Sequence, residues 1–495
     1  MFNALVTDIK NENIKSEYGP IKVYERSFST SGNTKVVLVK IDSQKFLVAV
    51  GNDELYTELQ GFENIGFKLA FPTHENRLVL NKFFPYTAPV ANVEHRTSVG
   101  LGDRLGLATP GHIETLRDTD VFPIFAQQSV RELDMTGRTY EDVIDTAAYA
   151  VFQEGYKKGY GADGDHLKTK EDITKELAIG ATMITLDSSE KIDNTIITLS
   201  KDEVASKYKS LDESIKSYYE GKYLDKNIGI DGLQMTINKE ALMNDVLVYH
   251  AAIDFIEEVY QEIIVKYERP IDFEISIDET STPTTATSHY IIASELKDRN
   301  IVISTMAPRF IGEFQKGIDY IGDLDEFRKD FKNHVAIANH FGYRISVHSG
   351  SDKFSIFPIV AEETNGRFHI KTAGTNWLEA VTVIAENNPA LYREIHQHAL
   401  DKFDAATKFY HVSTNLGNVP DLSTVADKDL PSYMKNNDGR QLLHITYGYI
   451  LQDKDEKGNY ILRDKFFNAL EEHSDAYREH LVSHIGNHLR LLKLK

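Results

Sequence analysis

The sequence has no cysteine among its 495 residues. This absence excludes disulfide bonds, zinc sites built on thiolates and cysteine nucleophiles. An apolar run of about 20 residues, the length that crosses a bilayer, is also missing. The first residues, "MFNALVTDIKNENIKSEYGP", lack the apolar stretch that follows a basic segment in a secretory signal. We therefore expect a soluble cytoplasmic protein.

Positive charge is the second shortage. The chain has 55 Lys and Arg residues against 75 Asp and Glu residues, for a formal net charge of -20. Such an acidic surface argues against nucleic-acid or membrane partners, although a local basic pocket can still hold an anionic small molecule. With 41% hydrophobic residues the chain can bury a large core. The oligomeric state stays open.

The first 90 residues show the alternation of apolar and polar residues that is typical of strands. The pattern predicts strands within 21–29, 34–51 and 76–84, joined by polar turns. No cluster of catalytic residue types occurs among them. We therefore expect residues 1–90 to form a β-rich N-terminal region.

From residue 91 onwards, predicted strands alternate with long predicted helices, which indicates βα units and a parallel sheet. The α/β class and the number of units favour a (β/α)8 TIM-type barrel over residues 91–495, with an open doubly wound sheet as the alternative. The polar residues 190–245 predict a helical insertion, and the C-terminus is helical. The predicted strands lie within 121–127, 181–189, 271–278, 300–310, 343–350 and 368–374.

The stretch "GLGDRLG" at 100–106 has glycine spacing like part of a dinucleotide-binding fingerprint. It lacks a clear preceding strand and an acidic residue at the expected distance. We therefore do not expect a nucleotide cofactor.

The stretch "GYGADGDHLKT" at 159–169 is either a mobile turn or the place where a strand meets an active site. Glycine and aspartate are frequent in turns. In a barrel, however, functional residues lie at the carboxyl ends of the strands. On that interpretation His166 is a candidate metal ligand and Asp165 a candidate acid or base.

Two further strand ends carry the same kinds of side chain. His348, in "YRISVHSGSDKFS", ends an apolar run and is either a ligand or a buried structural histidine. In "DFEISIDETS", Glu274, Ser276 and Asp278 share one face of a strand, since alternate residues point the same way. Two carboxylates on an otherwise apolar strand are costly unless they are paired or bound to a cation, which favours a functional role.

A fourth stretch, "APRFIGEFQKGIDYIGD", offers Arg309 for a substrate carboxylate and Glu313 or Gln315 as an oxygen ligand; an ordinary surface loop is the alternative. Together, two histidines and oxygen donors from separate strand ends match an open catalytic site for a divalent cation. With no cysteine, Zn, Mn, Fe and Mg all remain candidates.

These segments resemble the tagaturonate/fructuronate epimerase family, in long blocks from about residue 95 to about 380. Two of them are also distantly similar to the metal-dependent class II barrel aldolases. The resemblance implies a metal-dependent isomerase of hexuronate catabolism that acts on a keto-hexuronate. It also implies Asp165 as proton acceptor, Glu274 as proton donor, and His166, His348 and Gln315 as metal ligands, with Glu313 the alternative to Gln315. The blocks include "GLGDRLGLATPGH", "FAQQSVREL", "FQEGYKKGYGADGDHLKT", "TMITLDSSE", "APRFIGEFQKGIDYIGD", "SVHSGSDKFS" and "KTAGTNWLEA".

Tagaturonate and fructuronate differ at C4, whereas their carbonyl is at C2. The C4 hydrogen is not adjacent to the ketone, so direct deprotonation there is unattractive, and cleavage and re-formation of the C3–C4 bond is the expected route. Arg309 and Lys168 are candidates for holding the uronate carboxylate. Two alternatives remain: a class II-type aldolase that releases its fragments, and a non-catalytic sugar-acid binding protein.

Overall fold

The structure is a computed structural model that describes residues 2–495, and it separates into two compact units. The division into residues 1–90 and 91–495 expected from the sequence stays a prediction. Among the described residues, no helix is both long and apolar enough to cross a membrane. The first unit comprises Met1–Val90, Leu101–Ala162 and Ala373–Gly486, and the second comprises Ala91–Gly100, Asp163–Thr372 and Asn487–Lys495.

Eight strands close into a barrel in the order β10-β13-β14-β15-β16-β7-β8-β9. Neighbouring strands such as β10 and β13 run parallel, and each strand is buried along almost its whole length. This confirms the predicted TIM-type barrel and rules out the open sheet. The strands are β7 (Ser98–Leu101), β8 (Phe122–Gln127), β9 (Gly161–Leu167), β10 (Met183–Asp187), β13 (Asp272–Ile277), β14 (Thr305–Pro308), β15 (Arg344–Val347) and β16 (Phe368–Thr372).

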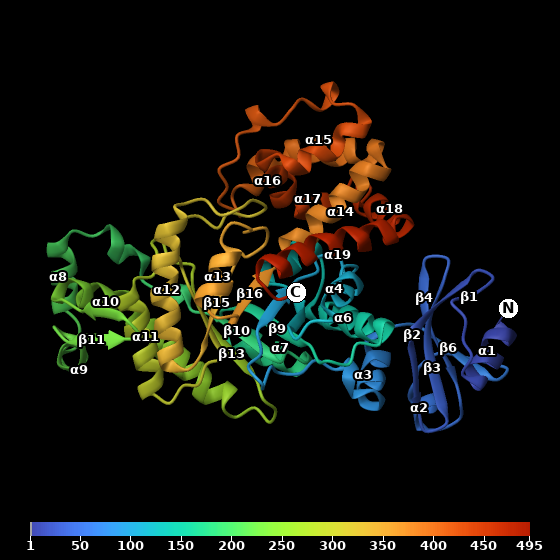
Figure 1. The fold of residues 1–495 in the computed structure, drawn as a ribbon, viewed down its shortest axis with the longest axis horizontal. Coiled ribbons are helices and arrows are strands. Elements are labelled where there is room, and N and C mark those ends of the chain that lie inside the picture. Colours follow the sequence, from blue (N-terminus) through green and yellow to red (C-terminus); the bar gives the residue numbers. More distant parts are fainter. Residues whose placement is uncertain (1) are drawn as a thin grey trace. The chain divides into compact units, whose positions relative to one another are not determined.

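The N-terminal region contains a six-stranded antiparallel sheet with the order β1-β2-β3-β4-β6-β5 (Figure 1). Both faces of β3 are covered: Val37 and Val39 pack with the helix at the N-terminus, while Val36 and Leu38 pack in a second apolar cluster. The strands are β1 (Glu17–Tyr18), β2 (Ile21–Ser31), β3 (Thr34–Ile41), β4 (Gln44–Val50), β5 (Phe62–Asn64) and β6 (Phe67–Ala70), with helices α1 (Phe2–Asn11), α2 (Glu54–Glu58) and α3 (His74–Phe83).

The strand predicted within 76–84 is wrong, because residues 76–83 belong to helix α3 and Phe84 is its C-cap. The Thr73 side chain accepts a hydrogen bond from the Asn76 backbone N–H, which caps the helix. Asn76, Arg77 and Leu80 form its buried side at helical spacing. A short apolar run fits both the two-residue period of a strand and the 3.6-residue period of a helix, and here the Thr73 cap favours the helix.

Long helices alternate with the barrel strands, and their ends carry recognisable signals. Thr139 and Asp142 form a capping box at the start of α6, and Gly155 ends that helix in the left-handed conformation. Thr169 caps α7 in the same way as Thr73 caps α3. Apart from those of the N-terminal region and two in the polar segment described next, the α-helices before the last barrel strand are α4 (Thr109–Leu116), α5 (Val130–Thr136), α6 (Tyr140–Glu154), α7 (Lys170–Ile179), α10 (Lys239–Val259), α11 (Ala286–Asp298), α12 (Leu324–Phe341) and α13 (Phe357–Glu363).

The polar segment 190–245 contains helices α8 (Lys201–Lys209) and α9 (Glu213–Tyr223), as expected for a helical insertion. It also contains a hairpin of β11 (Asn227–Ile230) and β12 (Leu233–Thr236), which the sequence interpretation missed. Asp231 and Gly232, both at positive φ, make its turn. An Asp-Gly pair between short apolar runs is a recognised hairpin signal.

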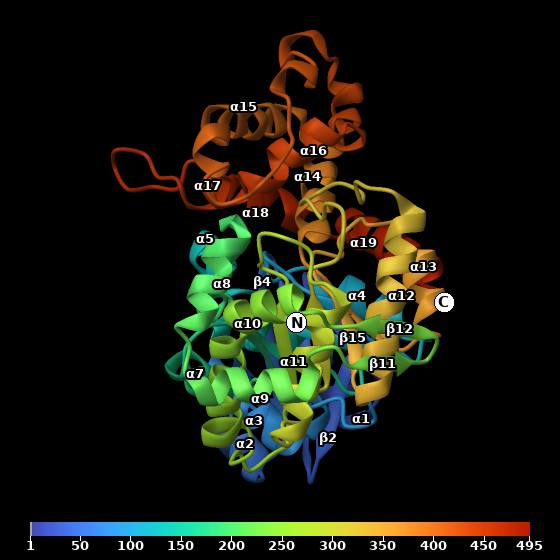
Figure 2. The same ribbon diagram turned by 90° about the vertical axis from the view of Figure 1, so that its left-hand side faces the viewer.

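The C-terminal helices share an apolar core, and Figure 2 shows α14 to α18 grouped together. The Trp377 ring stacks on Phe466 with 4.8 Å between centroids, and its Nε1 donates to the Leu443 carbonyl. The helices are α14 (Gly374–Asn387), α15 (Pro389–Ala406), α16 (Asn437–Ile445), α17 (Tyr447–Gln452), α18 (Arg463–Glu472) and α19 (Ser474–Leu491).

Asp245 on α10 gives a pH-dependent test of the packing between α10 and α11. Its carboxyl accepts a hydrogen bond from Ser288 Oγ at 2.6 Å, and burial raises its pKa from 3.8 to about 7. The raised value means that the folded state is penalised as the pH rises from about 4 to above 7. We expect Asp245→Asn to gain stability over the wild type across that window, by up to about 4 kcal/mol.

The measurement is thermal unfolding of both proteins between pH 4 and pH 8. The matched control is Asp231→Asn, an exposed position on the hairpin of the same insertion. A difference in melting temperature between Asp245→Asn and wild type that stays constant with pH would contradict the prediction.

Candidate active site

A β-bulge in β9 directs the adjacent side chains of Asp165 and His166 into the same site. Asp163 pairs with Met183 of β10 and Gly164 with Ile184, but the register then shifts and Leu167 pairs with Leu186. Successive strand residues normally point to opposite faces, and a bulge breaks that alternation. His166 adopts a left-handed conformation at φ 58°, which is uncommon for a residue other than glycine. The stretch 159–169 is therefore mainly a strand rather than a turn.

The strand register places three side chains in one row inside the barrel. Thr185 of β10 pairs with Glu274 of β13, and Glu274 pairs with Thr305 of β14. The Thr185 hydroxyl donates to Glu274 Oε1 at 3.1 Å, and the Thr305 hydroxyl donates to Oε2 at 2.6 Å. Glu274 is completely buried. The two threonines thus fix its carboxylate from both sides.

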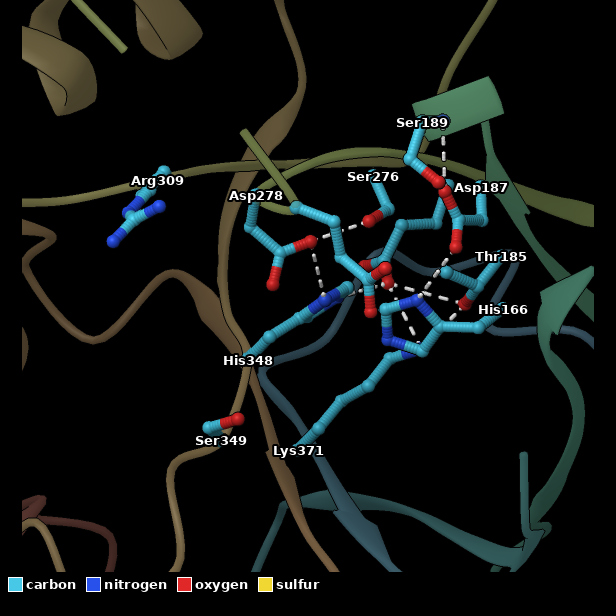
Figure 3. Close-up of polar contacts among 12 residues, drawn as sticks. His166, Thr185, Asp187, Ser189, Ser276, Asp278, Arg309, His348, Ser349 and Lys371 are labelled. Carbon is cyan, nitrogen blue, oxygen red and sulfur yellow. Dashed lines mark hydrogen bonds and ion pairs between the residues drawn. The ribbon is translucent and has the colours of Figure 1, made fainter. Parts of the chain in front are cut away.

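His348 follows β15 directly and lies between two carboxylates. Its Nε2 is 2.8 Å from Glu274 Oε1, and its Nδ1 is 3.3 Å from Asp278 Oδ1. The His166 ring lies edge-on to it, with 4.9 Å between the ring centroids. Figure 3 shows the two rings together, with Asp278 beside His348 and Asp187 beside His166. The structure thus brings together both predicted histidines and Glu274.

Lys371 of β16 supplies a buried positive charge that the sequence interpretation missed. Its ammonium group lies 2.7 Å from Asp163 Oδ2, 2.6 Å from Asp165 Oδ1 and 3.1 Å from Glu274 Oε1. It also donates to the Thr185 hydroxyl. Asp165, the predicted acid or base, therefore shares one cation with Glu274.

These contacts set the charge of each group. Burial acts to raise the pKa of Glu274 and of Asp165, but Lys371 and the neighbouring histidines together outweigh it and hold both below their usual range. Burial raises the pKa of Asp163 to about 6. Burial acts to lower the pKa of His348, yet Asp278 and Glu274 raise it to about 10. The surroundings of His348 therefore favour a positive charge.

His166, His348 and Asp278 have the geometry of a cation site. Each offers a ligand atom, and these atoms lie within 4.8 Å of one another. His348 Nε2 contacts Glu274, while the Nδ1 atoms of both histidines are buried without a regular hydrogen bond. Two imidazoles and one carboxylate suit Zn, Mn or Fe, and a carboxylate behind a ligand histidine is a common orienting partner. The residues present therefore fit a divalent cation.

Other candidates from the sequence lie differently. The Gln315 side chain is buried, and its role as third ligand stays a prediction, as does that of half-buried Glu313. The Arg309 guanidinium donates to the Thr280 carbonyl and lies apart from the histidines in Figure 3. The Lys168 ammonium is 3.4 Å from Asp187 Oδ2.

The loop after His348 is not arranged as an open anion cradle. The Gly350 N–H donates to the Lys371 carbonyl. The Lys353 ammonium is fully buried and donates to the backbone carbonyls of Gln315, Ile318 and Ser351. Its charge stabilises the loop from within.

All the residues that form this site, from Asp163 to Lys371, belong to the second unit. Lys371, Thr185 and Thr305 were missed because each sits within an apolar strand whose register the sequence does not give. One signal was present: Lys371 lies inside the strand predicted within 368–374, where a lysine is costly to bury without partners.

Comparison with known proteins places this geometry in context. The family model described as tagaturonate epimerase matches residues 24–492. The tagaturonate/fructuronate epimerase of Thermotoga maritima is 42% identical over 478 residues, which is 95% of this chain and 97% of that protein. A glycerol-complexed crystal structure of the fructuronate-tagaturonate epimerase of Cohnella laeviribosi matches with a TM-score of 0.95 and 53% identity, covering 100% of this chain and 99% of that one. The native crystal structure matches with a TM-score of 0.95 and 55% identity, covering 96% and 97%.

A side chain at Gly164, beside the bulge, would press on the ends of three buried side chains. An added Cβ would lie 2.7 Å from Glu176 Oε2, 2.8 Å from Leu167 Cδ1 and 3.0 Å from Ile184 Cδ1. Overpacking of this kind costs about 1–3 kcal/mol. We expect Gly164→Ala to lower the melting temperature measured by thermal unfolding.

Gly221→Ala is the matched control, because Gly221 lies in α9 and an added Cβ there meets no atom within 4 Å. That change should be neutral or stabilising, since alanine is the better helix former. Equal melting temperatures for the two variants would show that the strand next to the bulge is not tightly packed.

Proposed function

The chain belongs to the tagaturonate epimerase family, and from this premise we propose that it interconverts D-tagaturonate and D-fructuronate by inverting C4 of a keto-hexuronate. It is an enzyme of the epimerase type. The observation that carries the proposal is the pair of buried carboxylates, Asp165 and Glu274, on one ammonium group beside a two-histidine cation site. The proposed metabolic role is the catabolism of hexuronates.

The chemistry that fits this site is cleavage and re-formation of the C3–C4 bond. Removal of the C4 hydroxyl proton lets the bond break, which leaves an aldehyde at C4 and an enolate over C2 and C3. Rotation of the aldehyde fragment presents its other face, and bond formation then gives the opposite configuration at C4. Protein groups must therefore accept and return a proton at the C4 oxygen.

Asp165 is the proposed proton acceptor. Lys371 holds its carboxylate ionised, as an acceptor must be, and the side chain is slightly exposed beside His166. The bulge gives Asp165 and the adjacent His166 separate tasks in the same site. Asp165 moves the proton, and His166 holds the cation.

Glu274 is the proposed proton donor, and its surroundings add a second task. Its Oε1 accepts from His348 Nε2 at 2.8 Å, which orients that imidazole and leaves Nδ1 towards Asp278. To act as a donor, Glu274 must first take up a proton, because Lys371 and His348 hold its pKa down. If Glu274 transfers a proton, its loss should lower kcat alone; if it orients His348, its loss should also lower metal binding.

His166, His348 and an oxygen ligand are proposed to hold a divalent cation. When bound, such a cation supplies Lewis acidity at the C2 carbonyl and favours the enolate. Asp278 is the oxygen ligand that the geometry favours, because it faces His348 Nδ1 at 3.3 Å. Gln315 is the alternative expected from the sequence. Arg309 or Lys168 as the partner of the uronate carboxylate, and a cytoplasmic location, stay predictions.

The decisive experiment incubates the metal-loaded protein with tagaturonate, with and without chelator, and follows fructuronate by NMR. We expect conversion that stops with chelator, without release of free three-carbon products. Accumulation of such fragments would identify an aldolase instead.

Asp165→Asn should lower kcat by about 10²- to 10⁴-fold while the bound metal stays, because a general base is lost.

Glu274→Gln separates the two tasks of that residue. A loss of kcat of similar size with full metal content supports proton transfer, whereas a parallel loss of metal and activity assigns it to orienting His348. Near-normal turnover would remove both roles. The control is His340→Asn on the exposed last turn of α12, which should leave turnover and metal content unchanged.

The third ligand is tested by metal content. We expect Asp278→Asn to weaken metal binding by about 10-fold or more, and Gln315→Met to leave it within about 3-fold, since a ligand carboxylate is worth more than a neutral side chain nearby. Metal per protein is measured after dialysis against graded chelator. The reverse order would identify Gln315 as the ligand.

A further inference from the structure

We propose that Lys371 is a positioning residue that holds the two proton-transfer carboxylates, Asp165 and Glu274, on one ammonium group, with Asp163 and Thr185 as its anchors. The inference rests on the proposed epimerase function and assigns a task to residues that the cation site leaves unused. Asp163, which no motif explained, becomes part of the support of this lysine.

The ammonium group of Lys371 is enclosed by oxygen atoms from three strands. Asp163 and Asp165 come from β9, Thr185 from β10 and Glu274 from β13. Asp163 is fully buried, and its Oδ1 lies 2.9 Å from the Thr185 hydroxyl, whose single proton is donated either to Asp163 or to Glu274. Asp163 and Thr185 thus both hold the Lys371 ammonium group and contact each other. Asp165 and Glu274 are its two remaining carboxylate partners.

The stability of the fold alone does not account for a buried lysine with three buried carboxylates. Barrel interiors are usually filled by branched apolar side chains. Buried ion pairs can often be replaced by apolar residues without loss of stability, because desolvation of the charges offsets their attraction. Here one cation and three carboxylates are retained in the barrel core, which argues for a task in the reaction.

The task follows from the positions of the two proton-transfer groups. Without a shared cation, the Asp165 and Glu274 carboxylates would repel each other in a medium of low dielectric. The ammonium fixes the oxygen of each at 2.6 Å and 3.1 Å from one nitrogen atom. Displacements of about 1 Å at such groups cost large factors in rate. The three carboxylates also keep the amine protonated, so Lys371 does not act as a Schiff-base nucleophile.

The experiment compares Lys371→Met and Lys371→Ala with wild type in the NMR epimerisation assay. We expect kcat to fall by about 10²-fold or more in both, with KM within about 3-fold and metal content unchanged, because substrate and cation contacts remain. In Lys371→Ala, added n-propylammonium should restore at least about 10-fold of the lost kcat, and neutral n-propanol should not. A purely structural role would not respond to the charge of the added molecule.

Two further variants keep the result interpretable. Lys371→Met combined with Asp163→Asn removes one charge of each sign, so the barrel should fold even where the single variant does not, and kcat should stay low. Lys68→Met is the matched control. Lys68 is also buried, but it donates to the backbone carbonyls of Tyr56 and Leu59 in the N-terminal sheet. This change should lower stability and leave kcat unchanged.

The possible outcomes separate the two levels of inference. Wild-type enzyme that does not epimerise tagaturonate overturns the proposed function and this inference with it. An active wild type with near-normal kcat in a folded Lys371→Met protein overturns only the role of Lys371. So does loss of activity that follows loss of metal, or rescue by propanol equal to that by propylammonium. Trapping of substrate on Lys371 by borohydride would show a nucleophile instead.

Discussion

Buried negative charge is the constraint on which the rest of this site depends. Asp163, Asp165 and Glu274 lie inside a closed barrel, where an unpaired carboxylate is costly. Lys371 compensates all three from β16, and His348 adds a second positive partner for Glu274. The strand registers that bring these groups together are therefore as much a part of the chemistry as the groups themselves.

The site has two charge systems at different depths. The inner one is the Lys371 ammonium with its carboxylates. The outer one is the two histidines with Asp278, where the side chains of His166 and Asp278 are each 21% exposed and so lie within reach of an ion and a substrate. This separation suits a reaction in which a cation polarises a carbonyl while fixed carboxylates accept and return the proton of a hydroxyl group on another carbon.

Much of the site could be predicted from the sequence, because functional groups of a parallel barrel lie at strand ends. That rule selects His166 and His348, and the cost of a carboxylate on an apolar strand selects Glu274. The structure brings the three side chains together. It does not select Lys371, Thr185 or Thr305. Their roles depend on which strands are neighbours and at which register, and neither follows from one strand's own residues.

Prediction of secondary structure from local patterns failed where the same residues fit both a strand and a helix. The run at 76–84 matches a strand, but the Thr73 cap makes it a helix. The hairpin at Asp231 and Gly232 was missed although its turn signal is present in the sequence. The adjacent pair Asp165 and His166 is a different case, since alternation along a strand predicts that only one of them faces inward. The bulge resolves this conflict, and it forms in the interplay of β9 with β10 rather than in the residues of β9 alone.

The contact between Glu274 and His348 joins the inner and outer charge systems. One carboxylate oxygen of Glu274 lies against both the Lys371 ammonium and the His348 imidazole. A cation bound by His348 would draw electron density from that ring and strengthen its hydrogen bond to Glu274, which would weaken the hold of Glu274 on Lys371. Glu274 therefore belongs to both systems, so the cation site and the carboxylate pair lie side by side in the barrel.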